Sequence, residues 1–198
     1  MAGHLELLGE VDLGLATGRN LDTITSARLS WYPYNLTVSY PRLQLAFTLT
    51  SLADHLTVEG SGRPELYALL SEALRTIDTG ADGALVELWF KLRWLELSGY
   101  RPELVHCVVC GGNDAGSSYS FSAEHGGIMD ETCRTAITRP MPTATIKLWR
   151  ILSDYPYVTV AQIGGAEALA AESLGTCDEF YAHHVGRAFR KITPGVAS

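Results

Sequence analysis

Four side chains of types that bind metal ions occur in two short, similarly spaced groups. Cys107 and Cys110 form a C-x-x-C pair, and nineteen residues later Asp130 and Cys133 form a D-x-x-C pair. A structural zinc ion takes four ligands in a tetrahedron, and a C-x-x-C turn supplies two of them. The spacing therefore predicts a zinc site made of three thiolates and one carboxylate, with Cys107, Cys110, Asp130 and Cys133 as ligands.

The fourth ligand of this site has alternatives. An Asp oxygen binds zinc at a length comparable with a His nitrogen, but a hard oxygen among soft thiolates lowers the expected affinity. His106 and His125 lie close enough in the sequence to replace Asp130. A further alternative is a loop that folds without metal and leaves its thiols free. Cys177 is expected to be a small buried hydrophobic side chain rather than a ligand.

The bulk composition is that of a water-soluble chain with a core. The 198 residues are 46% hydrophobic, enough for one domain or slightly more. The most apolar stretch, 84–97, contains four charged residues, too many for a bilayer core. The first residues carry acids and no basic segment, so no signal peptide is expected. Four cysteines are too few for a disulfide scaffold, and we expect a cytoplasmic protein.

Charge is distributed unevenly along the chain. The net charge of −7 argues against a strongly basic nucleic-acid binder. Residues 1–133 carry 8 basic and 17 acidic side chains, whereas residues 134–198 carry 7 basic and 5 acidic ones. Contacts with phosphate or with an acidic partner are therefore expected in the last third. The candidates are Arg134, Arg139, Lys147, Arg150, Arg187, Arg190 and Lys191.

Helical periodicity begins near residue 39. Helices are expected from there to residue 56, from Pro64 to Ile77, and from about residue 85 to Gly99, with Glu87 and Lys91 as a pair on the polar side of the third. A further helix is expected near 143–152 and a short one near 164–165. A final helix is expected over 174–192, with Cys177 and Tyr181 on its apolar side and basic residues on its outer side.

The N-terminal region has a different pattern. Residues 5–15 and 21–32 are predicted to be strands separated by a turn at 17–20. An isolated hairpin is only marginally stable in water, so this one must pack on the helices or join further strands. Residues 104–136 have no periodicity and are rich in Gly, Ser and Cys, as expected of a finger-like insertion. The predicted division is 1–35 and 36–198.

Four segments, in order, resemble the RecO family of bacterial DNA-repair proteins. Residues 18–25 (GRNLDTIT) are similar to the last strand-turn-strand of its N-terminal OB domain. Residues 88–110, ending in CVVC, resemble the helix that leads into its zinc finger. Residues 121–127 (FSAEHGG) followed by Cys133 resemble the return half of the finger. Residues 181–190 (YAHHVGRAFR) resemble its closing helix.

The resemblance implies a mainly α fold: a helical bundle with a zinc-finger-like insertion, preceded by a partial OB-fold remnant. It also implies a recombination mediator that binds single- and double-stranded DNA and promotes annealing. Such a mediator works with a RecR-like protein, contacts the tail of single-stranded-DNA-binding protein and helps to load RecA. It would be associated with the nucleoid.

The sequence departs from the family in two places. Family members begin with several more OB strands, and a natural truncation or the choice of start site would account for the difference. Asp130 stands where the family usually has a third Cys, which bears on zinc rather than on the fold.

Two other functions compete with the mediator. A protein-interaction module that binds a RecR-like partner without DNA is favoured by the negative charge. A zinc deaminase is disfavoured, because His4-x-Glu6 and the Cys107 pair lie about a hundred residues apart without the usual α/β alternation. The patterns typical of serine hydrolases, phosphate loops and zinc proteases do not occur. We therefore expect a protein that is not an enzyme.

Overall fold

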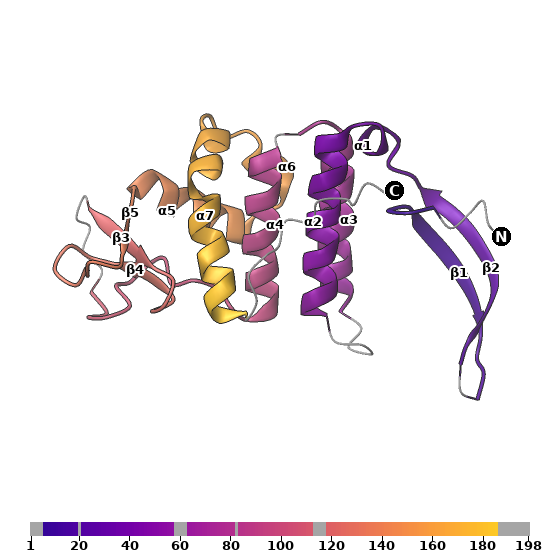
Figure 1. Cartoon of the computed structure of the whole chain (residues 1–198), viewed down its shortest axis with the longest axis horizontal. Helices are drawn as coiled ribbons and strands as arrows, with labels where there is room; N and C mark the ends of the chain where they lie inside the picture. Colours follow the sequence, from indigo (N-terminus) through magenta and orange to yellow (C-terminus); the bar gives the residue numbers. More distant parts are fainter. Residues whose placement is uncertain (1–5, 20, 58–62, 82, 113–117, 186–198) are drawn as a thin grey trace, which may run out of the picture.

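A body of packed helices carries a small β structure at each end. The computed structural model describes residues 6–19, 21–57, 63–81, 83–112 and 118–185. Along the longest axis, a two-stranded hairpin stands at one end and a three-stranded sheet at the other, with the helices between them (Figure 1). The predicted mainly α fold, with a finger-like insertion and an N-terminal β part, is confirmed. The division of the chain at residue 35 stays a prediction.

The helices of the body begin and end close to the predicted positions. The four long helices before the last one each start within three residues of their predicted start. Their bounds are Tyr40–Leu56 (α2), Pro64–Asp78 (α3), Gly83–Ser98 (α4) and Thr143–Asp154 (α5), with short helices at Tyr34–Thr37 (α1) and Tyr157–Val160 (α6). Pro64 occupies the first turn of α3, where its missing N–H is not needed. Gly99 takes a left-handed φ of +82° after α4, as its predicted role as terminator requires.

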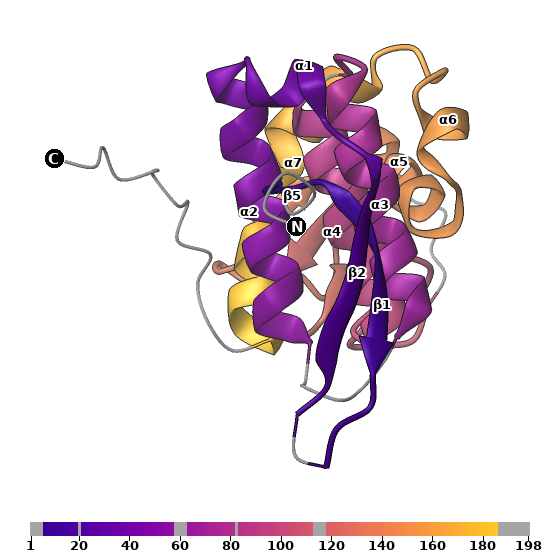
Figure 2. The ribbon, with the colours of Figure 1, turned by 90° about the vertical axis from the view of Figure 1, so that its right-hand side faces the viewer.

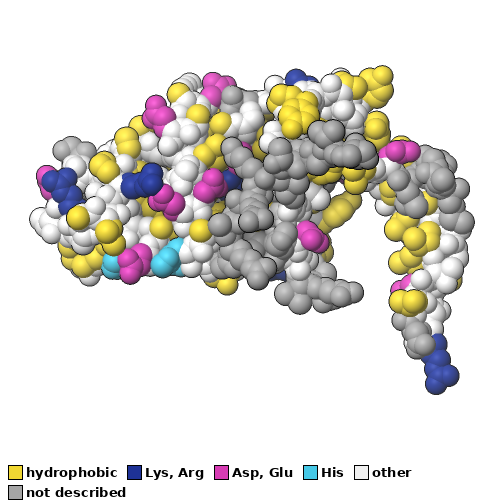
Figure 3. Space-filling view, in the orientation of Figure 1, with side chains coloured by type: hydrophobic (Ala, Val, Ile, Leu, Met, Phe, Trp, Pro, Cys, Tyr) yellow, Lys and Arg dark blue, Asp and Glu magenta, His cyan; other side chains and the backbone are white. Residues whose placement is uncertain are grey.

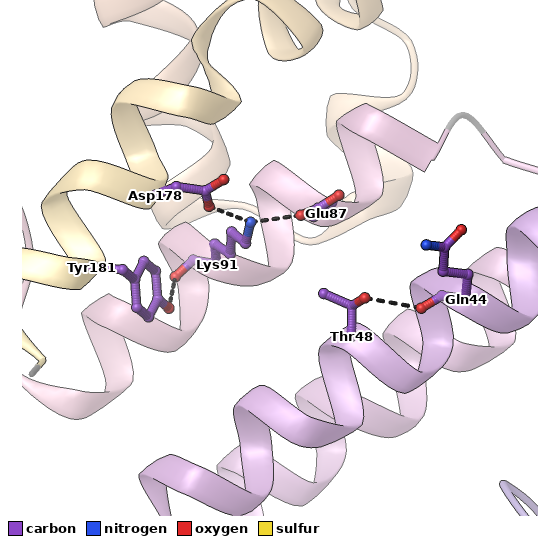
Figure 4. A network of polar contacts seen from close by, with 6 residues as sticks. All are labelled: Gln44, Thr48, Glu87, Lys91, Asp178 and Tyr181. Carbon is purple, nitrogen blue, oxygen red and sulfur yellow. Dashed lines mark hydrogen bonds and ion pairs between the residues drawn. The ribbon is translucent and has the colours of Figure 1, made fainter. Parts of the chain in front are cut away.

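Helix α4 is the centre of the body. The prediction that Glu87 and Lys91 lie on a polar outer face of α4 is wrong, because α4 is covered on nearly all sides by α3, α5 and the last helix. Lys91 is only 1% exposed, and its Nζ lies 2.6 Å from Glu87 and 2.5 Å from Asp178 (Figure 4). The Tyr181 hydroxyl donates to the backbone carbonyl of Lys91 at 2.7 Å. Lys91 thus joins α4 to the last helix through Asp178.

The C-terminal helix differs from its prediction. A short helix near 164–165 and a separate one over 174–192 were expected, but one helix, Ala166–His184 (α7), is observed. The alanine-rich segment 166–171 has high helix propensity, and Gly165, with φ +79°, forms the turn just before it. Cys177 and Tyr181 are buried as predicted. Arg187, Arg190 and Lys191 lie outside the described residues.

The N-terminal hairpin is confirmed. Its antiparallel strands are Glu10–Ala16 (β1) and Thr23–Trp31 (β2). The hairpin runs alongside the helical body, and its turn end reaches past the ends of the helices (Figure 2). Much of its surface is open, and Leu13 and Leu15 are 46% and 57% exposed. At its base, Glu10 contacts Ser71 and Arg75 of α3.

The insertion contains a small sheet that periodicity did not indicate. Its strands are Tyr119–Ser122 (β3), Gly127–Met129 (β4) and Arg139–Met141 (β5), in the order β4-β3-β5 and all antiparallel. The sheet thus extends beyond the predicted limit at residue 136. We call residues 104–141, where described, the finger. In the described part of the chain, no helix combines the length and the apolar character needed to cross a membrane.

Candidate metal centre

Two tight turns present the predicted metal ligands. In the first turn, the Cys107 N–H donates to Gly112 O at 2.9 Å and the Gly111 N–H donates back to Cys107 O at 2.9 Å. Gly111 has a φ of +72°, which favours glycine. The Gly112 N–H also points at Cys110 Sγ, 3.4 Å away. This turn therefore offers two sulfur atoms on one side and a backbone donor to one of them.

The second turn begins where β4 ends. Asp130 follows β4 directly, and its Oδ1 accepts hydrogen bonds from the Thr132 N–H (2.9 Å), the Thr132 hydroxyl (2.7 Å) and the Cys133 N–H (2.9 Å). A short carboxylate side chain commonly closes such a turn by binding the backbone two or three residues later. Asp130 thereby fixes the position of Cys133.

Backbone pairing holds the two turns together. The Val108 N–H donates to Ile128 O at 2.9 Å, which ties the first turn to β4. Glu103 forms a parallel bridge with Gly127, and a side chain at Gly127 would collide with the Glu103 carbonyl. Glycine at position 127 therefore allows the close approach of the two segments.

The structure brings all four predicted ligands together. The ligand atoms of Cys107, Cys110, Asp130 and Cys133 lie within 4.8 Å of one another, and Cys110 Sγ is 3.0 Å from Asp130 Oδ2. Donors at zinc bond lengths in a tetrahedron stand about 3.3–3.8 Å apart. Small side-chain movements would bring these atoms to that spacing. The donor set and its geometry therefore fit a zinc ion.

The alternative ligands lie elsewhere. His125 Nδ1 is hydrogen-bonded to Ser122 Oγ at 2.9 Å, and His106 Nδ1 lies 3.8 Å from the Glu103 carboxylate. Within the described ranges, neither belongs to the group of four. Cys177 is fully buried in α7, as predicted for a core side chain. The structure thus favours Asp130 over a histidine as the fourth group.

The electrostatics of the cluster depend on the Cys110–Asp130 contact. The Cys110 thiol and the Thr132 hydroxyl donate to Asp130 and hold the pKa of its carboxyl well below the usual value. The hydrogen bond that the Cys110 thiol donates to Asp130 raises the pKa of Cys110 to about 12. Burial raises the pKa of Cys107, but backbone N–H groups outweigh it and leave that pKa below the ordinary value. A metal ion that binds here must displace the Cys110 proton, which makes binding dependent on pH.

The finger is anchored to the helical body through an aromatic cluster. Phe121 of β3 is 2% exposed, and its ring centroid lies 5.4 Å from that of Trp149 and 5.9 Å from that of Phe180. His184 Nε2 lies 2.6 Å from the Ala123 carbonyl, and Arg150 Nε donates to the Leu104 carbonyl at 2.7 Å. These contacts were not predicted from the sequence, although the spacing of the aromatic residues in α5 and α7 is compatible with them.

The predicted cationic residues occupy different environments. Lys147 is exposed on α5, and the Arg134 guanidinium lies 3.6 Å from Glu131. Arg139 pairs with Glu179 of α7, and Arg150 is half-buried against Leu104. On the face shown in Figure 3, basic side chains are scattered among acidic ones over the finger and α7, without a continuous stripe. Their role in binding stays a prediction.

A shallow cleft of about 420 Å³, which was not predicted from the sequence, lies between the finger and α7. It is lined by polar and apolar side chains, among them Phe121, Ile137, Arg139, Glu179 and His183. Ile137 is 71% exposed.

Known proteins resemble this chain over most of its length. Residues 39–192 match the family described as "Recombination protein O C terminal". A "DNA repair protein RecO" of Dehalococcoides mccartyi is 31% identical over 164 residues, which cover 82% of this chain and 65% of that protein. A protein of the same description from Cutibacterium acnes is 32% identical over 197 residues, covering 96% and 78% of the two chains. The chain thus spans just under two thirds of the length of the Dehalococcoides relative.

Proposed function

The chain belongs to the RecO family, and from this premise we propose that it is a non-enzymatic recombination mediator in DNA repair. The observation that carries the proposal is the family match over residues 39–192, together with relatives described as DNA repair proteins. The proposed activity is binding of single- and double-stranded DNA, annealing of complementary strands and help in loading RecA. The N-terminal hairpin would be the counterpart of the last strands of an OB domain.

The cations around β5 and α5 are the proposed DNA contacts within the described residues. Lys147 is the strongest of them, because it is exposed and forms no ion pair with an acidic side chain in the part of the chain that the structure describes. Arg139 and Arg134 each face an acidic side chain and would have to exchange it for a phosphate. Arg150 would contribute least, since its guanidinium already binds the Leu104 carbonyl. Arg187, Arg190 and Lys191 complete the proposed set.

The test is the salt dependence of binding to single-stranded DNA. Each neutralised phosphate contributes about 0.7 to the slope of log K against log salt for single strands. We expect Lys147→Glu to weaken binding and to lower this slope, whereas the matched hairpin variant Arg28→Glu leaves both unchanged. Absence of measurable binding by the wild type at low salt would remove DNA from the proposal.

An interaction module without DNA contact is the second candidate, favoured by the net charge of −7. In that case a RecR-like partner binds while single-stranded DNA does not. An acidic, hydrophobic-tipped tail such as that of single-stranded-DNA-binding protein has suitable chemistry for the cleft with Arg139, His183 and Ile137. Titrating such a peptide against the wild type and Arg139→Glu tests whether the cleft binds it. The mediator would also bind the peptide, so binding of single-stranded DNA separates the candidates, because the module binds no DNA.

We also propose that Cys107, Cys110, Asp130 and Cys133 hold a zinc ion with a structural role. Bound zinc would cross-link the two turns of the finger, and no step of strand annealing is assigned to it. Zinc content of the purified protein, with Cys110→Ser and Cys133→Ser as variants, tests this. About one zinc per chain in the wild type and loss in both variants is expected for a four-ligand site.

A further inference from the structure

The two carboxylate oxygens of Asp130 have different surroundings. Oδ1 accepts three hydrogen bonds, two from Thr132 and one from the Cys133 N–H, at 2.7–2.9 Å. Oδ2 instead accepts a hydrogen bond from the Cys110 thiol, with Sγ 3.0 Å away, on the side of the cluster formed by the three cysteines. Turning Oδ1 toward a metal would break all three bonds in a side chain that is only 7% exposed.

We propose that Asp130 is a one-oxygen ligand: Oδ2 enters the metal site while Oδ1 clamps the turn that carries Cys133. The metal set is then three sulfurs and a single oxygen, and Thr132 is a positioning residue for both Asp130 and Cys133. This inference rests on the proposed zinc binding.

A one-oxygen ligand changes which metal ion the site prefers, compared with a site of four thiolates. Three thiolates and a carboxylate carry the same formal charge as four thiolates, so overall charge does not distinguish the two kinds of site. The softness of the ligand atoms does distinguish the two kinds of site. Oxygen binds a soft ion such as Cd²⁺ less well than sulfur does, whereas Zn²⁺ accepts an oxygen ligand. Compared with a four-thiolate finger, this site discriminates against cadmium in favour of zinc. The clamp on Oδ1 keeps the carboxylate from offering a second oxygen.

The direct test is zinc-edge X-ray absorption on the zinc-loaded full chain. Three sulfur neighbours at about 2.3 Å and one oxygen at about 2.0–2.2 Å are expected. Four sulfurs, an imidazole, or a second oxygen at bonding distance would each overturn the proposal, as would failure of the chain to take up zinc. The readout involves no DNA, so it fails or succeeds independently of the mediator function.

Two variants of Asp130 separate its roles as ligand and clamp. Asp130→Asn keeps an oxygen for the three turn hydrogen bonds but removes the negative ligand oxygen. Loss of a residue that only supports a metal ligand lowers metal affinity about tenfold to hundredfold. Because Asp130→Asn changes the ligand itself, we expect a larger fall in zinc affinity. Asp130→Cys restores a soft ligand, and we expect the ratio of cadmium to zinc affinity to rise about tenfold or more. An unchanged ratio would contradict the assigned selectivity.

Thr132→Val tests the clamp. It removes the hydroxyl that binds Oδ1 at 2.7 Å, and we expect zinc affinity to fall about tenfold, the low end for an outer-shell partner. The matched control is Glu131→Gln, which changes the exposed acid next to Asp130, outside the group of four. Equal zinc affinity in these two variants would refute the clamp. Circular dichroism of the metal-free proteins identifies a variant that does not fold, and the absorption spectrum of the wild type decides the proposal in that case.

Discussion

The N-terminal hairpin and the finger are both small β structures on one helical body, but they are attached in different ways. In the finger, strands β3 and β4 are almost entirely buried, and Phe121 packs between Trp149 and Phe180. In the hairpin, most side chains of β1 and β2 are exposed, and its base is joined to α3 chiefly through Glu10, Trp31 and Arg75.

We infer from this difference that apolar packing, rather than a metal ion, places the finger. Apolar packing, a non-directional force that scales with buried area, fixes the finger against α5 and α7. If zinc binds as proposed, it would order the two ligand turns. Within the described residues, Leu8 and Trp31 give the hairpin region a smaller apolar contact with the core. Its orientation therefore depends more on polar contacts, such as Glu10 with Arg75, that salt and pH weaken. Four predictions sharpen this contrast.

The largest effect is expected at the finger's aromatic anchor. Phe121→Ala removes a buried ring and leaves a cavity between two aromatic side chains, which should lower the free energy of unfolding by about 3–5 kcal/mol. Denaturant unfolding of the metal-free chain measures it. Ile137→Ala, on the exposed surface of the same finger, is the control, with a change within about 0.5 kcal/mol. A small effect of Phe121→Ala would mean that packing does not place the finger.

A smaller and local effect is expected at the base of the hairpin. Arg75→Ala removes both the ion pair with Glu10 at 2.6 Å and the guanidinium stacked 4.6 Å from the Trp31 ring centroid. Together these contacts are worth about 1–2 kcal/mol. Hydrogen exchange in residues 10–16 and 23–31 should therefore accelerate, while residues 119–122 stay protected. Acceleration in both regions would contradict the separate attachment.

Within the hairpin itself, Arg28→Ala should change almost nothing. The Arg28 and Asp12 side chains are 82% and 62% exposed, and pairs of this kind contribute about 0–1 kcal/mol. The same exchange measurement applies. An effect as large as that of Arg75→Ala would show that the strand pairing, rather than the base, controls the hairpin.

Acidic pH should loosen the hairpin before the finger. Hydrogen bonding from Arg75 outweighs burial and holds the pKa of Glu10 below its usual value. A depressed pKa in the folded state gives stability that is present above the unfolded pKa, about 4.3, and is lost as pH falls through the folded value. Tryptophan fluorescence with Trp31→Phe as reference follows the change at Trp31. Glu10→Gln should abolish this transition, and its persistence would assign it to another group.

Local sequence determined much of the fold and the metal cluster. Helices α3 and α5 have one buried and one exposed face, so their periodicity and the Pro64 signal located them. The four candidate ligands were found from spacing alone, because each turn is closed by residues within six positions of one another. The hairpin was predicted for the same reason, from two alternating segments and a turn.

What the sequence did not show depends on contacts between distant residues. Helix α4 is buried on nearly every side, and its sequence pattern did not reveal that Lys91 is buried against Asp178, 87 positions away. The use of Arg150 and Arg139 as anchors to Leu104 and Glu179 is equally non-local. Their charge alone suggested phosphate binding, since a guanidinium suits a carbonyl, a carboxylate and a phosphate alike.

The most direct test of how the finger is built is hydrogen exchange by mass spectrometry on the full chain, with zinc and after chelation. We expect chelation to expose the amides of the two ligand turns, residues 107–112 and 130–133, while those of 119–122 stay as protected as with zinc. If 119–122 instead exchange as fast as the exposed hairpin once the metal is removed, the metal rather than the Phe121 cluster holds the finger to the body.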